Sequence, residues 1–182
     1  SLEVLYTTPS FYERIKCCDI SKDFHQVVCG STDGYILIFS LSNQTFLRTI
    51  KLDKGKKPQF IMITKSWGFI FSVLTEISDA KKKTYLAVWT INGDFIKIQE
   101  IEQEITKITT WRSKSGFDYF LFSTPKYDII AGEVFTLETF FTSKVSDEVI
   151  SLGYDYDLEN AIVLSKDGIV WFIPCAAPPP EF

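Results

Sequence analysis

The sequence is poor in residues that enzymes use as nucleophiles, bases and phosphate-binding loops. Among 182 residues there is a single histidine, His25. A Ser-His-Asp or Cys-His system would have to be built around this one imidazole, and no obvious nucleophile lies next to it in the sequence. We therefore expect His25 to be a partly buried structural residue in a strand over 25–31. Neither Gly-x-x-x-x-Gly-Lys nor Gly-x-Gly-x-x-Gly occurs, which argues against a phosphate-binding loop.

The sequence also lacks the usual spacing of metal ligands. "DYDLEN" (155–160) begins like a calcium loop, but Asn160 stands where the glycine is needed and Lys166 where the final glutamate is needed. We interpret this stretch as a turn. With one histidine and no Cys-x-x-Cys pair, a zinc site is not supported, and we expect no metal and no cofactor. The cysteines are expected to be free, mostly buried thiols: Cys17, Cys18, Cys29 and Cys175.

Basic charge and long apolar runs are lacking too. The net charge is −4 and the pI about 5.1, whereas broad nucleic-acid binding needs a basic surface. No apolar run approaches the roughly 18 residues that a membrane-spanning helix needs. We expect no nucleic-acid partner and a cytoplasmic location.

The sequence does contain short apolar runs, rich in aromatic residues and separated by turns. Aromatic residues make up 15% of the chain, and helical periodicity is almost absent. Asn92-Gly93 predicts a primed two-residue hairpin turn, and "ISDAKKK" (77–83) is expected to loop out. Strands are expected at 2–6, 14–20, 25–31, 35–41, 45–52, 59–64, 68–76, 84–91, 94–101, 105–111, 118–123, 128–135, 139–145, 148–154, 160–165 and 168–174.

These strands recur as a repeat. Four residues that close the third strand of each round, Phe39, Trp89, Ala131 and Ile173, lie 50, 42 and 42 positions apart. A propeller blade of the WD-repeat kind has four strands and roughly 40–45 residues. We therefore predict an all-β protein, a WD-repeat-like β-propeller of about four blades over residues 1–174, followed by a flexible Pro-rich tail over 175–182. The blades are placed at about 11–52, 58–101, 104–145 and 147–174, with 2–6 completing a neighbouring or closing blade.

Several stretches together carry a family resemblance. "GSTDGYILIFSL" (30–41) resembles the end of a WD-repeat blade. Combined with "ITKSWGFIFSV" (63–73) and "VWTINGDFI" (88–96), it resembles the C-terminal propeller of BEACH-domain proteins, the beige and neurobeachin relatives, with divergent protist members the most similar. The blade-ending Asp and the blade-start Gly-His of regular WD repeats are absent. We therefore expect no Asp-His-Ser/Thr-Trp network, and blades held by strand ladders and apolar packing.

The resemblance implies a function and a larger context. It implies a seven-bladed ring, of which this chain would be part, with a BEACH domain upstream. It also implies a non-catalytic protein-interaction scaffold in vesicle or membrane traffic, with peripheral membrane association through the rest of the chain. Self-association through open blade edges is a further expectation.

Two alternatives remain open. One is a WD-repeat subunit of another intracellular complex, such as a coat, ciliary or autophagy assembly. The other is a propeller enzyme such as a glycosidase, but the expected inner strands carry one carboxylate, Asp19. We therefore expect no catalytic residues and no enzymatic activity.

Two features are candidates for a contact surface. The apolar turn at 135–141 would be a partner patch if exposed, and otherwise packs beneath a blade. Two lysine clusters on predicted loops of one blade would contact an acidic partner or an anionic surface, or else simply keep these loops solvated. These lysines are Lys54, Lys56, Lys57, Lys81, Lys82 and Lys83.

Overall fold

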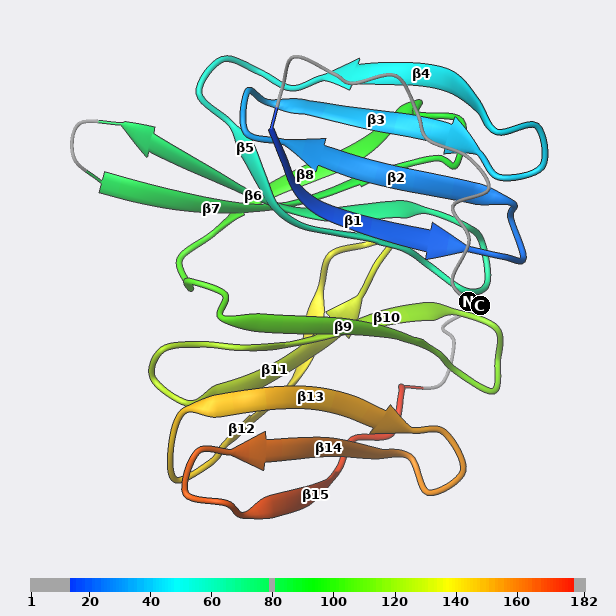
Figure 1. Cartoon of the computed structure of the whole chain (residues 1–182). Helices are drawn as coiled ribbons and strands as arrows, with labels where there is room; N and C mark the ends of the chain where they lie inside the picture. Colours follow the sequence, from blue (N-terminus) through cyan, green and yellow to red (C-terminus); the bar gives the residue numbers. More distant parts are fainter. Residues whose placement is uncertain (1–13, 79–80, 179–182) are drawn as a thin grey trace, which may run out of the picture.

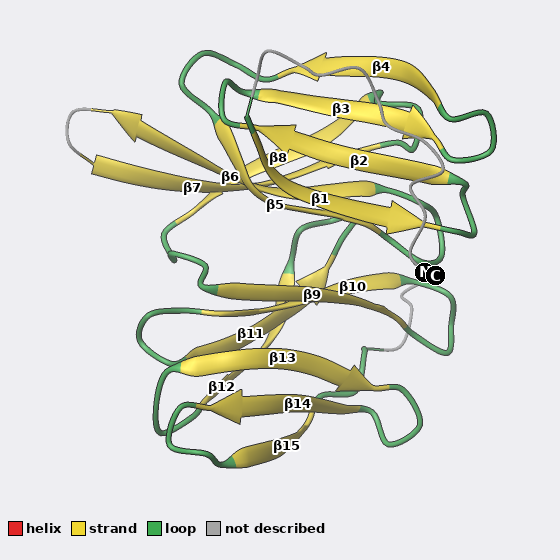
Figure 2. Cartoon of the chain, viewed as in Figure 1, coloured by secondary structure: helices red, strands yellow, loops and turns green. Residues whose placement is uncertain are grey.

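The computed structural model describes residues 14–78 and 81–178, which form fifteen strands and no helix (Figures 1 and 2). The first sheet contains β1 (Ile15–Ser21), β2 (Gln26–Ser31), β3 (Tyr35–Ser40) and β4 (Thr45–Lys51). The second contains β5 (Lys57–Ile63), β6 (Ile70–Ser78), β7 (Lys81–Trp89) and β8 (Phe95–Ile101). The third contains β9 (Lys107–Arg112), β10 (Asp118–Ser123), β11 (Asp128–Glu133) and β12 (Thr139–Lys144). The fourth contains β13 (Val149–Asp155), β14 (Asn160–Ser165) and β15 (Val170–Pro174).

Each sheet is an antiparallel meander in which strands pair in chain order. The sheets follow one another from β1–β4 to β13–β15 (Figure 1). Their first strands lie side by side, because β5 contacts β1, β9 contacts β5 and β13 contacts β9. The all-β class and the fifteen strands expected within 14–174 are confirmed. The strand expected at 2–6 lies outside the described residues.

Three hydrophobic clusters fill the spaces between consecutive sheets. The first joins Val28 and Ile38 of the first sheet to Ile61 and Trp89 of the second. The second joins Phe71 of the second sheet to residues of the third. The third packs Trp111, Tyr119, Leu121 and Ile129 of the third sheet against Val149, Ala161 and Val163 of the fourth. The four sheets are therefore held together by face-to-face apolar burial.

Single polar ties supplement these cores. The backbone N–H of Ile63 donates to the Asp19 carboxylate at 2.8 Å, which links the first sheet to the second. Asp19, the one carboxylate expected on the inner strands, is thus engaged in holding two sheets together.

A hydroxyl network lies in the fourth sheet. The Ser165 hydroxyl accepts the indole N–H of Trp171 at 3.1 Å and donates to Asp167 Oδ1. This trio joins a tryptophan, a serine and an aspartate within one sheet, without the histidine of regular WD repeats. The network depends on the buried Ser165 at the end of β14 and not on a Trp-Asp pair at the end of β15.

Residues 77–78 and 81–83 belong to paired strands, contrary to the loop predicted from the sequence. β6 and β7 continue as a paired ladder out to Ser78 and Lys81, and the hairpin projects beyond its sheet (Figure 1). Glu76 lies opposite Lys83 in this ladder. Such cross-strand pairing of opposite charges favours the extended form over a loop.

Two further local predictions are wrong. The predicted two-residue turn at Asn92-Gly93 is a three-residue loop. Thr90 N donates to Asp94 O and Gly93 N donates to Thr90 O, both at 2.8 Å, and Gly93 closes the loop in the left-handed region at φ 86°. His25 is exposed in the turn before β2 at φ 51° rather than partly buried in a strand.

The C-terminal tail begins later than expected. Cys175 is only 2% exposed and belongs to the third cluster, where its carbonyl accepts the Tyr154 hydroxyl at 3.0 Å. The chain therefore remains packed just past β15.

The four thiols should differ sharply in reactivity. All are free, and burial raises the pKa of Cys17, Cys29 and Cys175 to about 11, whereas Cys18 is exposed. Because the thiolate is the reactive form, we expect N-ethylmaleimide to modify Cys18 first. Mass spectrometry after brief labelling of the native protein checks this order. Labelling of Cys175 as fast as Cys18 would contradict the packing of the tail.

Candidate functional site

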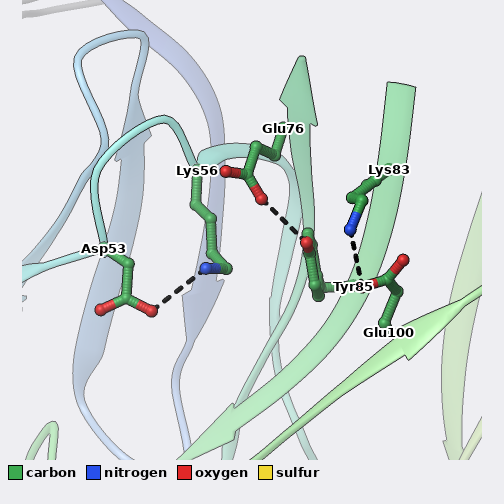
Figure 3. A network of polar contacts seen from close by, with 6 residues as sticks. All are labelled: Asp53, Lys56, Glu76, Lys83, Tyr85 and Glu100. Carbon is green, nitrogen blue, oxygen red and sulfur yellow. Dashed lines mark hydrogen bonds and ion pairs between the residues drawn. The ribbon is translucent and has the colours of Figure 1, made fainter. Parts of the chain in front are cut away.

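Three of the six predicted lysines are engaged within the protein, and Figure 3 shows two of them, Lys56 and Lys83. Lys56 Nζ lies 3.1 Å from Asp53 and 4.9 Å from the centre of the Tyr85 ring, with its side chain only 15% exposed. Lys83 pairs with Glu100 at 3.4 Å. Lys82 pairs with Glu104.

These pairings weaken the basic surface expected from the sequence. Only Lys54 and Lys56 lie on the predicted loop between β4 and β5, because Lys57 is in β5 and Lys81, Lys82 and Lys83 are in β7. The cavity of about 330 Å³ beside the loop is lined by Asp33 and Asp53 as well as by lysines. Its four lysines, Lys51, Lys54, Lys56 and Lys57, outnumber the two aspartates, so this lining keeps a net positive charge.

Tyr85 is the best-connected residue of this network and makes the chain sensitive to alkali. Its hydroxyl donates to Glu76 Oε2 at 2.8 Å, and this bond, followed by burial, raises the pKa of Tyr85 to about 12 (Figure 3). The folded pKa exceeds the ordinary value of 10, so the stabilisation is complete below pH 10 and is lost as the pH rises towards 12. We expect Tyr85→Phe to show a smaller loss of unfolding free energy between pH 9 and 12 than the wild type does. Urea unfolding at several pH values measures this, and equal pH slopes would contradict it.

An aromatic groove lies elsewhere, where turns of the second and third sheets meet. It has a volume of about 250 Å³. Trp67 and Phe135 are 61% and 53% exposed, and the Phe69 and Phe135 rings lie 5.8 Å apart. The groove is lined by Trp67, Phe69, Phe117, Asp118, Glu133 and Phe135.

The turn that carries Trp67 is fixed by hydrogen bonds. The buried Asp118 carboxylate accepts the backbone N–H groups of Ser66 at 2.9 Å and of Trp67 at 3.0 Å. Gly68 follows at φ 67°, where an added Cβ would lie 2.8 Å from the Phe24 ring, so only glycine fits. Trp67 is therefore held at the surface by its backbone.

The turn that carries Phe135 is fixed as well. The Thr136 hydroxyl donates to Glu133 Oε2 at 2.6 Å, and Lys97 of β8 donates to the Thr136 carbonyl. Leu137, at φ 61° and 1% exposed, anchors the turn in the second cluster. The groove is thus preformed by two turns of different sheets.

The chemistry of the groove is aromatic and acidic. None of its six lining residues is basic. Glu133 Oε2 takes the Thr136 hydroxyl, while among the described residues Oε1 accepts no hydrogen bond. A ligand that combines apolar surface with a positive charge would match these walls.

Only part of this groove can be recognised in the sequence. The apolar turn at 135–141 combines the two alternatives predicted for it, exposure and packing, because Phe135 is exposed and Leu137 is buried. Trp67 lies between the strands predicted at 59–64 and 68–76, in a stretch that the sequence marks only as a connection. An aromatic residue in a turn just before glycine, as in "KSWG", is the signal that could have indicated an exposed ring.

The other candidate features of the sequence are a turn at 155–160 and possible metal ligands that the described part of the fold does not bring together. Asp155 Oδ1 accepts the backbone N–H groups of Asp157 and Leu158, so "DYDLEN" is a turn held by its own aspartate. In the described part of the chain no three His, Cys, Asp or Glu side chains come together as a metal site would require. The same residues contain no helix able to cross a membrane.

Comparison with known proteins gives the fold alone. No family model matches the sequence, and no curated protein matches it either. The crystal structure of the computationally designed Ika4 protein is similar over 95% of this chain and 99% of Ika4, with a TM-score of 0.61 and 19% identity. The designed Ika8 protein is similar over 87% of this chain but 46% of Ika8, with a TM-score of 0.60 and 18% identity.

Proposed function

We propose that this chain is a non-catalytic protein-interaction scaffold and that the aromatic groove is its main contact surface. The observation that carries the proposal is the exposed pair Trp67 and Phe135, held in place by turns of two different sheets. Exposed aromatic residues on a rigid base are the usual anchors of protein interfaces, because they bury large area at little cost in conformational entropy. Such a site needs no cofactor and no reacting group.

We further propose that the four sheets are consecutive blades of a β-propeller. The support is the meander order within each sheet and the adjacency of the first strands. In a ring, further sheets would cover the outer faces of both end sheets. In this chain Phe172 of the last sheet is 62% exposed and Ile20 of the first is 59% exposed, as expected of blades from a larger, seven-bladed ring.

The place in membrane traffic rests on the resemblance to the C-terminal propeller of BEACH-domain proteins. The alternative is a WD-repeat subunit of a coat, ciliary or autophagy complex. The coding sequence upstream of Ser1, read from full-length transcripts, separates the two. A BEACH domain there supports the first, and a helical solenoid supports the second.

Affinity capture from cells of the source organism tests the scaffold proposal. The chain would be compared with a Trp67→Ala/Phe135→Ala double variant and with Phe172→Ala, which removes an equally exposed aromatic ring from another sheet. We expect a defined protein set to bind the wild type and Phe172→Ala, and to be lost with the double variant. Full retention by the double variant would contradict the groove as the contact surface.

A further inference from the structure

We infer that the aromatic groove receives a lysine side chain of a partner polypeptide. This inference rests on the proposed scaffold function, and it adds the chemistry of the residue that is recognised. The groove is small, aromatic rings make up most of its lining, and two carboxylate residues, Asp118 and Glu133, complete it. Each of these features limits which ligand can bind.

Size argues for a single side chain. The groove measures about 250 Å³, below the roughly 300–1,000 Å³ of sites for whole drug-sized ligands. Its walls come from turns of the second and third sheets, so the opening lies at the surface rather than inside a core. A side chain that projects from a partner surface can enter such an opening without any rearrangement of the two turns.

Shape and apolar area argue for a long aliphatic stem. Trp67, Phe69, Phe117 and Phe135 present ring surfaces to the groove. The four methylenes of lysine bury well against apolar surface while the ammonium remains near polar groups. A short acidic or amide side chain would leave much of the aromatic surface exposed to water, and an acidic one would also bring a further negative charge near Glu133.

Charge argues for a cation. Aromatic faces attract a positive charge within about 6 Å of the ring centre, most strongly for tryptophan. In the described lining, Glu133 Oε1 is the one available acceptor, whereas Asp118 is only 3% exposed and contributes its charge from beneath the Trp67 turn. No lysine or arginine lines the groove to compete for these groups.

The acceptor pattern favours lysine over arginine. A guanidinium achieves its strength by a two-point contact with both oxygens of one carboxylate. At Glu133 one oxygen already accepts the Thr136 hydroxyl, and each oxygen of Asp118 already accepts one backbone N–H, so neither carboxylate offers two oxygens free of hydrogen bonds. A single ammonium needs only the one oxygen that remains.

A titration with small probes tests the inference directly. N-acetyl-lysine-methylamide and N-acetyl-norleucine-methylamide have the same stem, but only the first carries a charge. The readout is the indole N–H signal of Trp67 in a two-dimensional NMR spectrum, assigned as the signal that disappears in Trp67→Phe. We expect the lysine probe to bind about tenfold more tightly than the norleucine probe.

Two variants and a matched control complete the test. Glu133→Gln keeps an oxygen for the Thr136 hydroxyl and removes only the charge, so we expect it to lose about fivefold in affinity for lysine and none for norleucine. Phe135→Ala should weaken both probes, and Phe172→Ala should weaken neither. Equal binding of the two probes, or no effect of Glu133→Gln, would overturn the inference. If that happened while captured proteins still depended on Trp67 and Phe135, the scaffold proposal would stand and only the lysine assignment would fall.

Discussion

Replacing Phe120 with alanine is expected to reduce the free energy of unfolding by about 3–5 kcal/mol, the largest effect of any single change considered. Phe120 has no exposed surface, and its ring stacks on Phe71 at 5.3 Å and on Phe122 at 5.8 Å between the second and third sheets. Gly132 lies against this ring so closely that an added Cβ would be 2.3 Å from Phe120 Cζ. The surrounding residues are thus fitted to this ring, and its removal leaves a cavity in the core that joins the two middle sheets.

Urea unfolding followed by tryptophan fluorescence measures this loss. Phe172→Ala is the matched control, because the same side chain is removed at a site that is 62% exposed, where we expect a change within about 1 kcal/mol. A Phe120→Ala protein as stable as the control would show that the middle sheets do not depend on this core.

Replacing Asp118 with alanine is expected to cost about 2–4 kcal/mol and to abolish binding of the lysine probe. Asp118 is 3% exposed, and its two oxygens satisfy the backbone N–H groups of Ser66 and Trp67. Alanine leaves both donors without an acceptor and releases the turn that positions the indole. The binding loss follows from the position of Trp67 and not from the charge alone.

Hydrogen exchange at the amides of Ser66 and Trp67 distinguishes this mechanism from a general loss of stability. Both amides should exchange much faster in Asp118→Ala, while amides of β14 in the fourth sheet should be changed far less. Asp118→Asn retains one acceptor and should fall between the wild type and the alanine variant. Unchanged exchange at residues 66 and 67 would contradict the positioning role of Asp118.

Much of the fold could be predicted from the sequence because it depends on local patterns. Short apolar runs bounded by turn residues located every strand from 14 to 174, and the 42-residue spacing indicated a repeated sheet. The errors arose where pairing at a distance overrides a local signal. The run "ISDAKKK" is polar enough for a loop, yet Glu76 and Lys83 extend the ladder across it.

The site was harder to predict because it depends on where separate turns meet. Trp67, Asp118 and Phe135 are far apart in the chain, and only the packing of the second sheet on the third brings them together. The pairing of Lys56, Lys82 and Lys83 with carboxylates was hard to predict for a related reason. Their partners, Asp53, Glu100 and Glu104, are ordinary surface residues in the sequence, and the folded structure places them within reach of the ammonium groups.

Site-specific photo-crosslinking in cells tests the central claim, that this chain binds a protein through the aromatic groove. A photoreactive benzoylphenylalanine would replace Trp67 in one version of the protein and Phe172 in another. The two sites are comparably exposed, 61% and 62%, but lie on different sheets. We predict discrete protein adducts from position 67 and none of the same mass from position 172. No adduct at position 67, or the same adducts from both positions, would contradict the claim.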